Sequence, residues 1–115
     1  MAIVIYHNPR CTKSRETMKL LEEKGIKPQV IEYLKAPPSA TELKDLLAKL
    51  GIGPRELLRK GEAPYKDLKL ADPKLSDSAI IKAMVENPIL IERPIVVNGK
   101  KAALGRPPES VLKIL

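Results

Sequence analysis

The first 34 residues constrain the fold most, because two short apolar runs flank a helical segment there. Residues 3–6 (IVIY) predict a buried strand, which the polar, proline-containing stretch 7–9 ends. Residues 12–24 predict a helix that stops at Gly25, and residues 30–34 predict the next strand. A strand–helix–strand unit of this kind has parallel strands joined by a right-handed crossover.

Helical signals fill the middle of the chain. Ser39 and Glu42 form a capping-box pattern before a leucine stripe that ends at Gly51. Pro54 favours the first turn of a short helix that runs through Leu58. Residues 59–75 predict an irregular stretch with a helical turn near Tyr65. A further helix is predicted to start at Ser76 or Asp77 and to stop at Asn87-Pro88.

The last part of the chain predicts two strands and a helix. Residues 95–97 and 102–104 predict strands, and Asn98-Gly99 between them is typical of a type I′ hairpin turn. Pro107 predicts the start of a final helix. The order β-α-β, helical insertion, β-β-α predicts an α/β fold. We expect one mixed four-stranded sheet with helices on both faces, in a single domain over residues 1–115.

Composition excludes several classes of function. A single cysteine rules out a disulfide framework, and no His, Cys or Asp spacing indicates a metal site. The net charge of +7 favours anionic partners, but dispersed lysines and only three aromatic residues argue against a nucleic-acid partner. No stretch approaches the ~20 apolar residues of a membrane span, and no basic leader opens the chain. We therefore expect a cytoplasmic protein without membrane contact.

Cys11 lies where the first strand ends and the first helix begins. A lone cysteine is usually an inert buried side chain, but this position favours an activated thiol. A helix N-terminus carries partial positive charge and unpaired N–H groups, both of which favour a thiolate and bind anions. Arg10 and Arg15 flank Cys11, and His7 precedes it by four residues. His7 either acts as a cation near the thiol or satisfies a local polar group, and the sequence leaves both open.

Two arginines distant in the sequence are expected near Cys11. If the third strand lies antiparallel to the first, Arg93 before it and Arg106 after the fourth strand share the sheet edge with Cys11. An arginine fork suits an oxyanion, because it donates two hydrogen bonds to adjacent oxygens.

A cysteine-phosphatase loop, which has five residues between its cysteine and its arginine, is excluded, because only three residues separate Cys11 from Arg15. We interpret Arg55 as a solvated surface residue.

Several motifs together resemble a known family. They are residues 7–15 (HNPRCTKSR), 57–60 (LLRK), 87–91 (NPILI), 93–97 (RPIVV) and 105–107 (GRP). In this order they resemble the glutaredoxin-dependent arsenate reductase (ArsC) family, and the resemblance spans nearly the whole chain. It implies a thioredoxin-like fold with a cis-proline at Pro94.

The resemblance also implies a reaction. Cys11 would be the nucleophile that attacks arsenate, and His7 would help to keep it a thiolate. Glutathione would be the cosubstrate and glutaredoxin the partner that restores Cys11, with no tightly bound cofactor. The residues placed near arsenate by the resemblance are Arg59, Arg93, Arg106, Ser14 and Arg15.

Two other functions stay open within this superfamily. One is a glutathione-dependent thiol reductase that acts on another substrate. The other is a thiol-sensing transcription regulator that binds RNA polymerase. Such a regulator typically carries C-x-x-C at this position, and Ser14 replaces the second cysteine here. This difference disfavours RNA polymerase as a partner.

Overall fold

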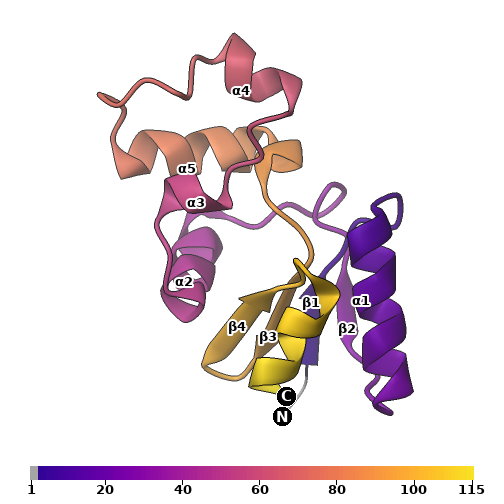
Figure 1. Ribbon diagram of the computed structural model, residues 1–115. Coiled ribbons are helices and arrows are strands. Elements are labelled where there is room, and N and C mark those ends of the chain that lie inside the picture. Colours follow the sequence, from indigo (N-terminus) through magenta and orange to yellow (C-terminus); the bar gives the residue numbers. More distant parts are fainter. Residues whose placement is uncertain (1–2) are drawn as a thin grey trace. The chain divides into compact units, whose positions relative to one another are not determined.

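The computed structural model describes residues 3–115, which divide into two compact units (Figure 1). Residues 3–36 and 93–115 form a sheet unit, and Pro37–Glu92 form a helical unit. The expectation of a single domain stays a prediction. Within residues 3–115, no helix is both long and apolar enough to cross a membrane.

The sheet unit contains four strands in the order β2-β1-β3-β4. Strand β1 (Ile3–Tyr6) pairs parallel with β2 (Gln29–Ile31) and antiparallel with β3 (Ile95–Asn98), which pairs antiparallel with β4 (Lys101–Leu104). This arrangement confirms the predicted mixed sheet of an α/β, thioredoxin-like fold. It also confirms that the third strand lies beside the first and antiparallel to it.

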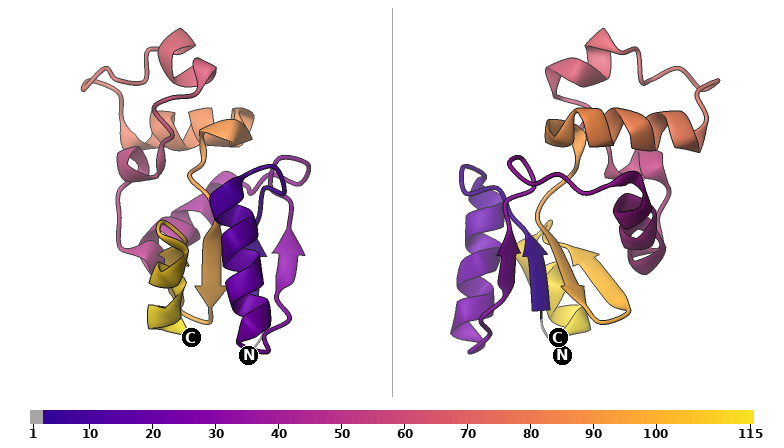
Figure 2. Two further views of the ribbon diagram at one scale, coloured as in Figure 1. Left: turned by 45° about the vertical axis from the view of Figure 1, so that its right-hand side comes forward. Right: turned by 180° about the vertical axis from the view of Figure 1, so that it is seen from behind.

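Helix α1 (Thr12–Glu23) and the 3₁₀ helix η2 (Pro108–Ile114) lie on the same face of this sheet (Figure 2). Leu21 of α1 and Val111 of η2 pack with the strand residues Ile5 and Val96 in a fully buried core cluster. Burying each such side chain contributes roughly 1.5–3 kcal/mol. This core holds α1 and η2 against the central strands β1 and β3.

Two local predictions in the sheet unit are wrong. Strand β2 ends at Ile31, because the chain turns at Glu32, whose carbonyl accepts hydrogen bonds from Lys35 and Ala36. The hairpin loop is Gly99-Lys100, not Asn98-Gly99, since Asn98 pairs with Lys101. Gly99 adopts a φ of 63° and Lys100 does not adopt a positive φ, a pattern that belongs to a type II′ turn.

The final helix also differs from an α-helix. Ser110 donates to the carbonyl of Pro107, and Leu115 donates to that of Leu112, which is the i→i+3 pattern of a 3₁₀ helix. Pro107 and Pro108 have no backbone N–H to give. Prolines are tolerated here, because the first N–H groups of a helix have no partner within it.

The helical unit contains α2 (Ala40–Leu50), α3 (Pro54–Leu57), α4 (Ala63–Asp67), α5 (Asp77–Glu86) and η1 (Pro88–Leu90). The predicted capping box of Ser39 and Glu42 is present, and Gly51 ends α2 with a φ of 70°. Ser76 caps α5 by accepting a hydrogen bond from the Ala79 N–H. Helix α5 contacts α2, α3 and η1, and its buried side chains form the centre of this unit.

Arg55 has a structural role that the sequence analysis missed. Its guanidinium donates hydrogen bonds to the carbonyl oxygens of Leu70 (2.9 Å), Asp72 (2.7 Å) and Leu75 (3.0 Å). These bonds hold the segment that follows α4. Arg55 is therefore a loop anchor rather than a solvated surface residue.

Replacing Arg55 with alanine should destabilise the protein by about 2 kcal/mol, because three carbonyl groups, two of them in part-buried hydrogen bonds, lose a charged donor. The free energy of unfolding, measured by chemical denaturation, checks this expectation. Lys66→Ala, at an exposed position in α4, is the matched control and should cost little. Equal stability of the two variants would contradict the anchoring role.

Candidate active site

Cys11 occupies the N-cap position of α1, with an extended backbone at φ −91° and ψ 125°. Its N–H donates to the carbonyl oxygen of Asn8 at 3.0 Å, which closes a tight turn between β1 and α1. The side chain is half-buried, so a small substrate can reach the sulfur. The first turn of α1, which the structure describes in full, carries no acidic residue to oppose an anion.

The surroundings of Cys11 favour the thiolate. Burial raises the pKa of the thiol, but three other groups outweigh this effect. The Ser14 N–H, the hydrogen bond and positive charge of Arg93, and the Lys13 N–H lower the Cys11 pKa below its ordinary value. The helix N-terminus thus acts on the sulfur as the sequence predicts.

The rate of Cys11 alkylation by iodoacetamide should rise with pH around a midpoint below that of a free thiol, roughly 8.5. Only the thiolate reacts, and a lowered pKa raises the thiolate fraction at neutral pH. N-acetylcysteine under the same conditions gives the reference curve. A midpoint at or above this reference would contradict the activated thiol.

Arg93 and Arg106 converge on the sulfur, as predicted from the strand order. Arg106 lies on the surface and directs its Nη2 toward Cys11 Sγ at 3.7 Å. Its Nε donates to the carbonyl oxygen of Arg93 at 2.8 Å, which fixes the direction of the guanidinium. Arg93 is only 8% exposed and interacts with Cys11 by both charge and hydrogen bond. Two cationic forks therefore face the nucleophile.

The backbone around these arginines is closely packed. Both the Arg93–Pro94 and Arg106–Pro107 peptide bonds are cis, which includes the one expected at Pro94. The Gly105 N–H donates to the Pro94 carbonyl oxygen at 2.9 Å. A Cβ at Gly105 would lie 2.5 Å from Thr17 Oγ1 and 2.6 Å from Pro94 Cγ. Only glycine allows β4 to approach α1 this closely.

Gly105→Ala should therefore destabilise the protein by about 1–3 kcal/mol and displace the neighbouring Arg106. Thermal unfolding measures the first effect, and the pH profile of Cys11 alkylation measures the second. Gly61→Ala is the matched control, because a Cβ there meets no atom within 4 Å. Wild-type behaviour of Gly105→Ala in both assays would refute the proposed close packing.

His7 reaches Cys11 through Ser14. Its Nδ1 lies 2.6 Å from Ser14 Oγ, which also accepts a hydrogen bond from the Asn8 N–H at 3.0 Å. Burial lowers the His7 pKa, an effect that Glu32 partly opposes, so the imidazole is largely neutral at pH 7. Of the two interpretations of His7, the geometry favours the polar contact that orders the start of α1.

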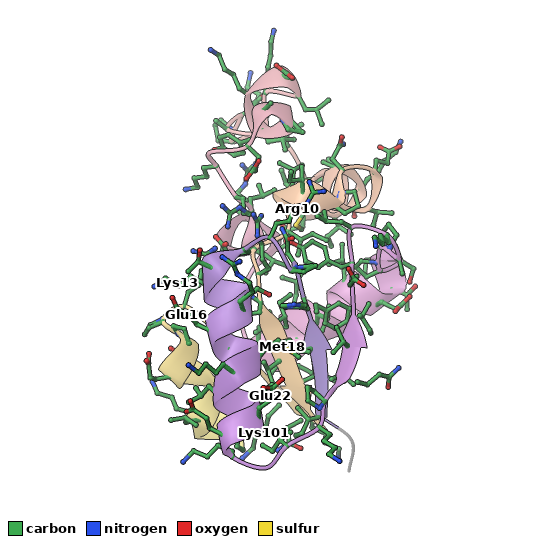
Figure 3. The ribbon with its side chains drawn as sticks, turned by 90° about the vertical axis from the view of Figure 1, so that its right-hand side faces the viewer. Arg10, Lys13, Glu16, Met18, Glu22 and Lys101 are labelled. Carbon is green, nitrogen blue, oxygen red and sulfur yellow. The ribbon has the colours of Figure 1, made fainter. Side chains whose placement is uncertain are left out.

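Ser14 and Arg15 differ in what they offer an anion. The Ser14 hydroxyl is buried and bonded to His7 and Asn8, so its backbone N–H is the group that faces the sulfur. The Arg15 side chain is exposed, and its Nη2 donates to Thr12 Oγ1 at 3.4 Å. Figure 3 shows this end of α1, where Arg10 and Lys13 are labelled.

Arg59 belongs to the helical unit, where two carboxylates hold it. Its Nε lies 3.2 Å from Glu62 Oε2, and its Nη1 lies 2.7 Å from Glu92 Oε1. A short antiparallel pairing between Leu58 and Ile91 sets Arg59 next to Glu92. Burial lowers the Arg59 pKa, but Glu92 and Glu62 outweigh this effect and raise it above its ordinary value, so this guanidinium stays charged.

Sequence reasoning missed three residues that support the site. Asn8 caps the turn through its backbone and side chain, since its Oδ1 accepts from the Arg10 N–H. Glu32 acts electrostatically on His7, and Gly105 allows the close approach of β4. The G-R-P motif was the only available signal for Gly105. Within residues 3–115, no group of His, Cys, Asp or Glu side chains could hold a metal ion.

Comparison with known proteins gives consistent matches along the chain. The family model described as ArsC family matches residues 6–114. A protein of Escherichia coli named "Uncharacterized protein YfgD" is 57% identical over 98% of this chain and 96% of its own. The arsenate reductase of Haemophilus influenzae is 51% identical over 100% of both chains. The solved structure of arsenate reductase from Vibrio cholerae is 57% identical, with a TM-score of 0.98, and covers 100% of this chain and 98% of its own.

Proposed function

The chain belongs to the ArsC family, and we propose that it is an arsenate reductase in which the Cys11 thiolate is the nucleophile. The observation that carries the proposal is the position of Cys11 at a helix N-terminus, with Arg93 and Arg106 directed at its sulfur. The names of the relatives in Haemophilus influenzae and Vibrio cholerae support arsenate as the substrate.

In the first step the Cys11 sulfur attacks the arsenic atom of arsenate. A sulfur–arsenic bond forms, and one arsenate oxygen leaves as water after it takes up protons. Arg93 and Arg106 hold the remaining oxygens through bidentate hydrogen bonds. Backbone N–H groups at the start of α1, including that of Ser14, add donors to the developing charge.

Arg59 and Arg15 are further ligands for the oxyanion in this proposal, and their roles rest on the family resemblance. Both are permanently charged, and Arg15 lies in the first turn of α1. His7 is a positioning residue: it orders Ser14 and thereby the N–H group that faces the sulfur.

Two thiols supply the electrons for reduction. Glutathione displaces a second oxygen on arsenic, and the glutaredoxin thiol then forms a disulfide with glutathione. Two electrons pass to arsenic, which stays bound to Cys11, and water then hydrolyses this sulfur–arsenic bond to release arsenite and the Cys11 thiol. The net reaction turns arsenate and two thiols into arsenite, one disulfide and water. Cys11 is the chain's only cysteine, so the resolving thiols come from other molecules.

This cycle requires no tightly bound cofactor and a supply of reduced glutathione, so we place it in the cytoplasm. A second candidate is a glutathione-dependent thiol reductase with another substrate, because an activated thiol also reacts with disulfides. The buried, hydrogen-bonded Ser14 at the position of a second cysteine favours either enzyme over a regulator of RNA polymerase.

The test measures arsenite formed from arsenate by the purified protein with glutathione and glutaredoxin. Parallel reactions replace glutaredoxin by thioredoxin with its reductase, or omit glutathione. We expect turnover only in the complete glutathione–glutaredoxin reaction. Turnover with thioredoxin alone would overturn the glutaredoxin dependence, and absence of arsenite in every reaction would overturn arsenate as the substrate.

A further inference from the structure

A cavity of about 260 Å³ lies beside the loop that carries Cys11. Residues 7–10 line one side, and three residues of the turn after β2 line the other: Glu32, Leu34 and Lys35. Its volume is close to the roughly 300 Å³ at which small-molecule sites begin, so it has room for part of a short peptide. The arsenate chemistry proposed above uses neither Arg10 nor Lys35, the two cations of its rim.

The rim of the cavity has a specific charge pattern. Arg10 and Lys35 are exposed cations. Glu32, in the turn after β2, is the only carboxylate among the residues that line this cavity. Lys35 Nζ lies 3.8 Å from Glu32 Oε1, and these side chains are 81% and 44% exposed. An exposed pair of this kind is weak and can exchange its partner for a ligand. Leu34, 40% exposed, adds an apolar wall.

The cavity is also within reach of the nucleophile. Arg10 lines it and directly precedes Cys11, so the two Cα atoms are about 3.8 Å apart. Figure 3 shows Arg10 at the same end of α1 as Lys13, and Lys101 near the opposite end. A tripeptide spans roughly 10 Å when extended, so its central residue can approach the sulfur while its ends contact the rim.

We propose that this cavity is the glutathione-binding site. The neighbouring Glu32 and Lys35 fit the α-ammonium and α-carboxylate of the γ-glutamyl end. Arg10 fits the glycine carboxylate at the other end, which leaves the cysteinyl thiol between them. Glutathione carries two carboxylates and one ammonium, and the rim carries two cations and one carboxylate. The inference rests on the proposed function, in which glutathione is the cosubstrate.

The test uses a reaction that needs no arsenate. When the Cys11 thiolate attacks glutathione disulfide, the glutathione S–S bond breaks, a Cys11–glutathione disulfide forms, and glutathione thiolate leaves. Mass spectrometry follows this addition with three reagents: glutathione disulfide, the dianionic dithiodipropionate, and uncharged hydroxyethyl disulfide. The second reagent reports general electrostatic attraction, and the third reports the intrinsic reactivity of the thiol.

The variants are Arg10→Ala, Lys35→Ala and the Arg10→Ala/Lys35→Ala double variant, with Lys101→Ala as the exposed control. We expect the rate of reaction with glutathione disulfide, relative to the rates with both other reagents, to fall about threefold in each single variant. In the double variant it should fall about tenfold. Lys101→Ala should match the wild type. Normal reaction with hydroxyethyl disulfide shows that a variant is folded and its thiol intact.

If the reaction rates with glutathione disulfide and with dithiodipropionate fall equally, the site is overturned, because equal decreases would indicate charge attraction alone. Unchanged glutathione rates in the double variant would overturn it as well. If the wild type makes no arsenite but shows the expected rate pattern, the substrate assignment fails and the glutathione site stands. If arsenite forms and the rate pattern is absent, only the site fails.

Discussion

Replacing Cys11 with serine should reduce arsenite production by at least about 10³-fold, the largest effect we expect from any single substitution. A serine hydroxyl keeps the shape of the side chain but stays protonated where the lowered pKa of Cys11 gives a thiolate. It also cannot form the sulfur–arsenic bond that the proposed cycle needs. The measurement is arsenite released per enzyme per minute with glutathione and glutaredoxin.

Two controls make this result specific. The thermal unfolding midpoint of Cys11→Ser should stay near that of the wild type, because the side chain is only half-buried. Alkylation by iodoacetamide should vanish, because Cys11 is the only cysteine. Arsenite production that persists in the folded variant would show that Cys11 is not the nucleophile.

Arg93→Ala should have the second largest effect, with a loss of about 10²- to 10³-fold in arsenate turnover. Arg93 is 8% exposed, and its charge and hydrogen bond lower the Cys11 pKa. The alanine variant should therefore also move the pH midpoint of Cys11 alkylation upward. Arg106 should keep its direction, because its Nε bonds to the backbone carbonyl of residue 93.

Arg93→Lys separates the two roles of this side chain. Lysine keeps the positive charge but lacks the fork that binds two oxygens at once. The alkylation midpoint should return toward that of the wild type, and turnover should recover only in part. Full recovery of turnover would mean that charge alone accounts for Arg93, and an unshifted midpoint in Arg93→Ala would remove its role at the thiol.

Local signals in the sequence predicted most of the fold because they act over a few residues. The capping box of Ser39 and the stop at Gly51 fixed the ends of α2. The predictions failed where tertiary contacts decide. The run over residues 30–34 is apolar enough for a strand, but the turn at Glu32 ends it early. The apparently solvated Arg55 binds carbonyl groups up to 20 residues away.

The site was predictable to the extent that topology determines it. Once β3 lies antiparallel to β1, Arg93 and Arg106 must reach the sheet edge of Cys11. Side-chain directions were not predictable, because hydrogen bonds to specific neighbours set them. The resemblance placed Ser14 near the anion but could not say that its N–H would face the sulfur while its hydroxyl contacts His7.

The hairpin at Gly99-Lys100 has a consequence for how the chain can vary in length. In the β3–β4 register, Ile95 pairs with Leu104. Extending this register by two residues, before β3 on one side and after β4 on the other, places Arg93 opposite Arg106. Inserting or deleting one residue in this loop would shift the register and reverse the faces of β4. A loop at the far end of the sheet from Cys11 is thus expected to tolerate changes at Lys100 but no change in its number of residues.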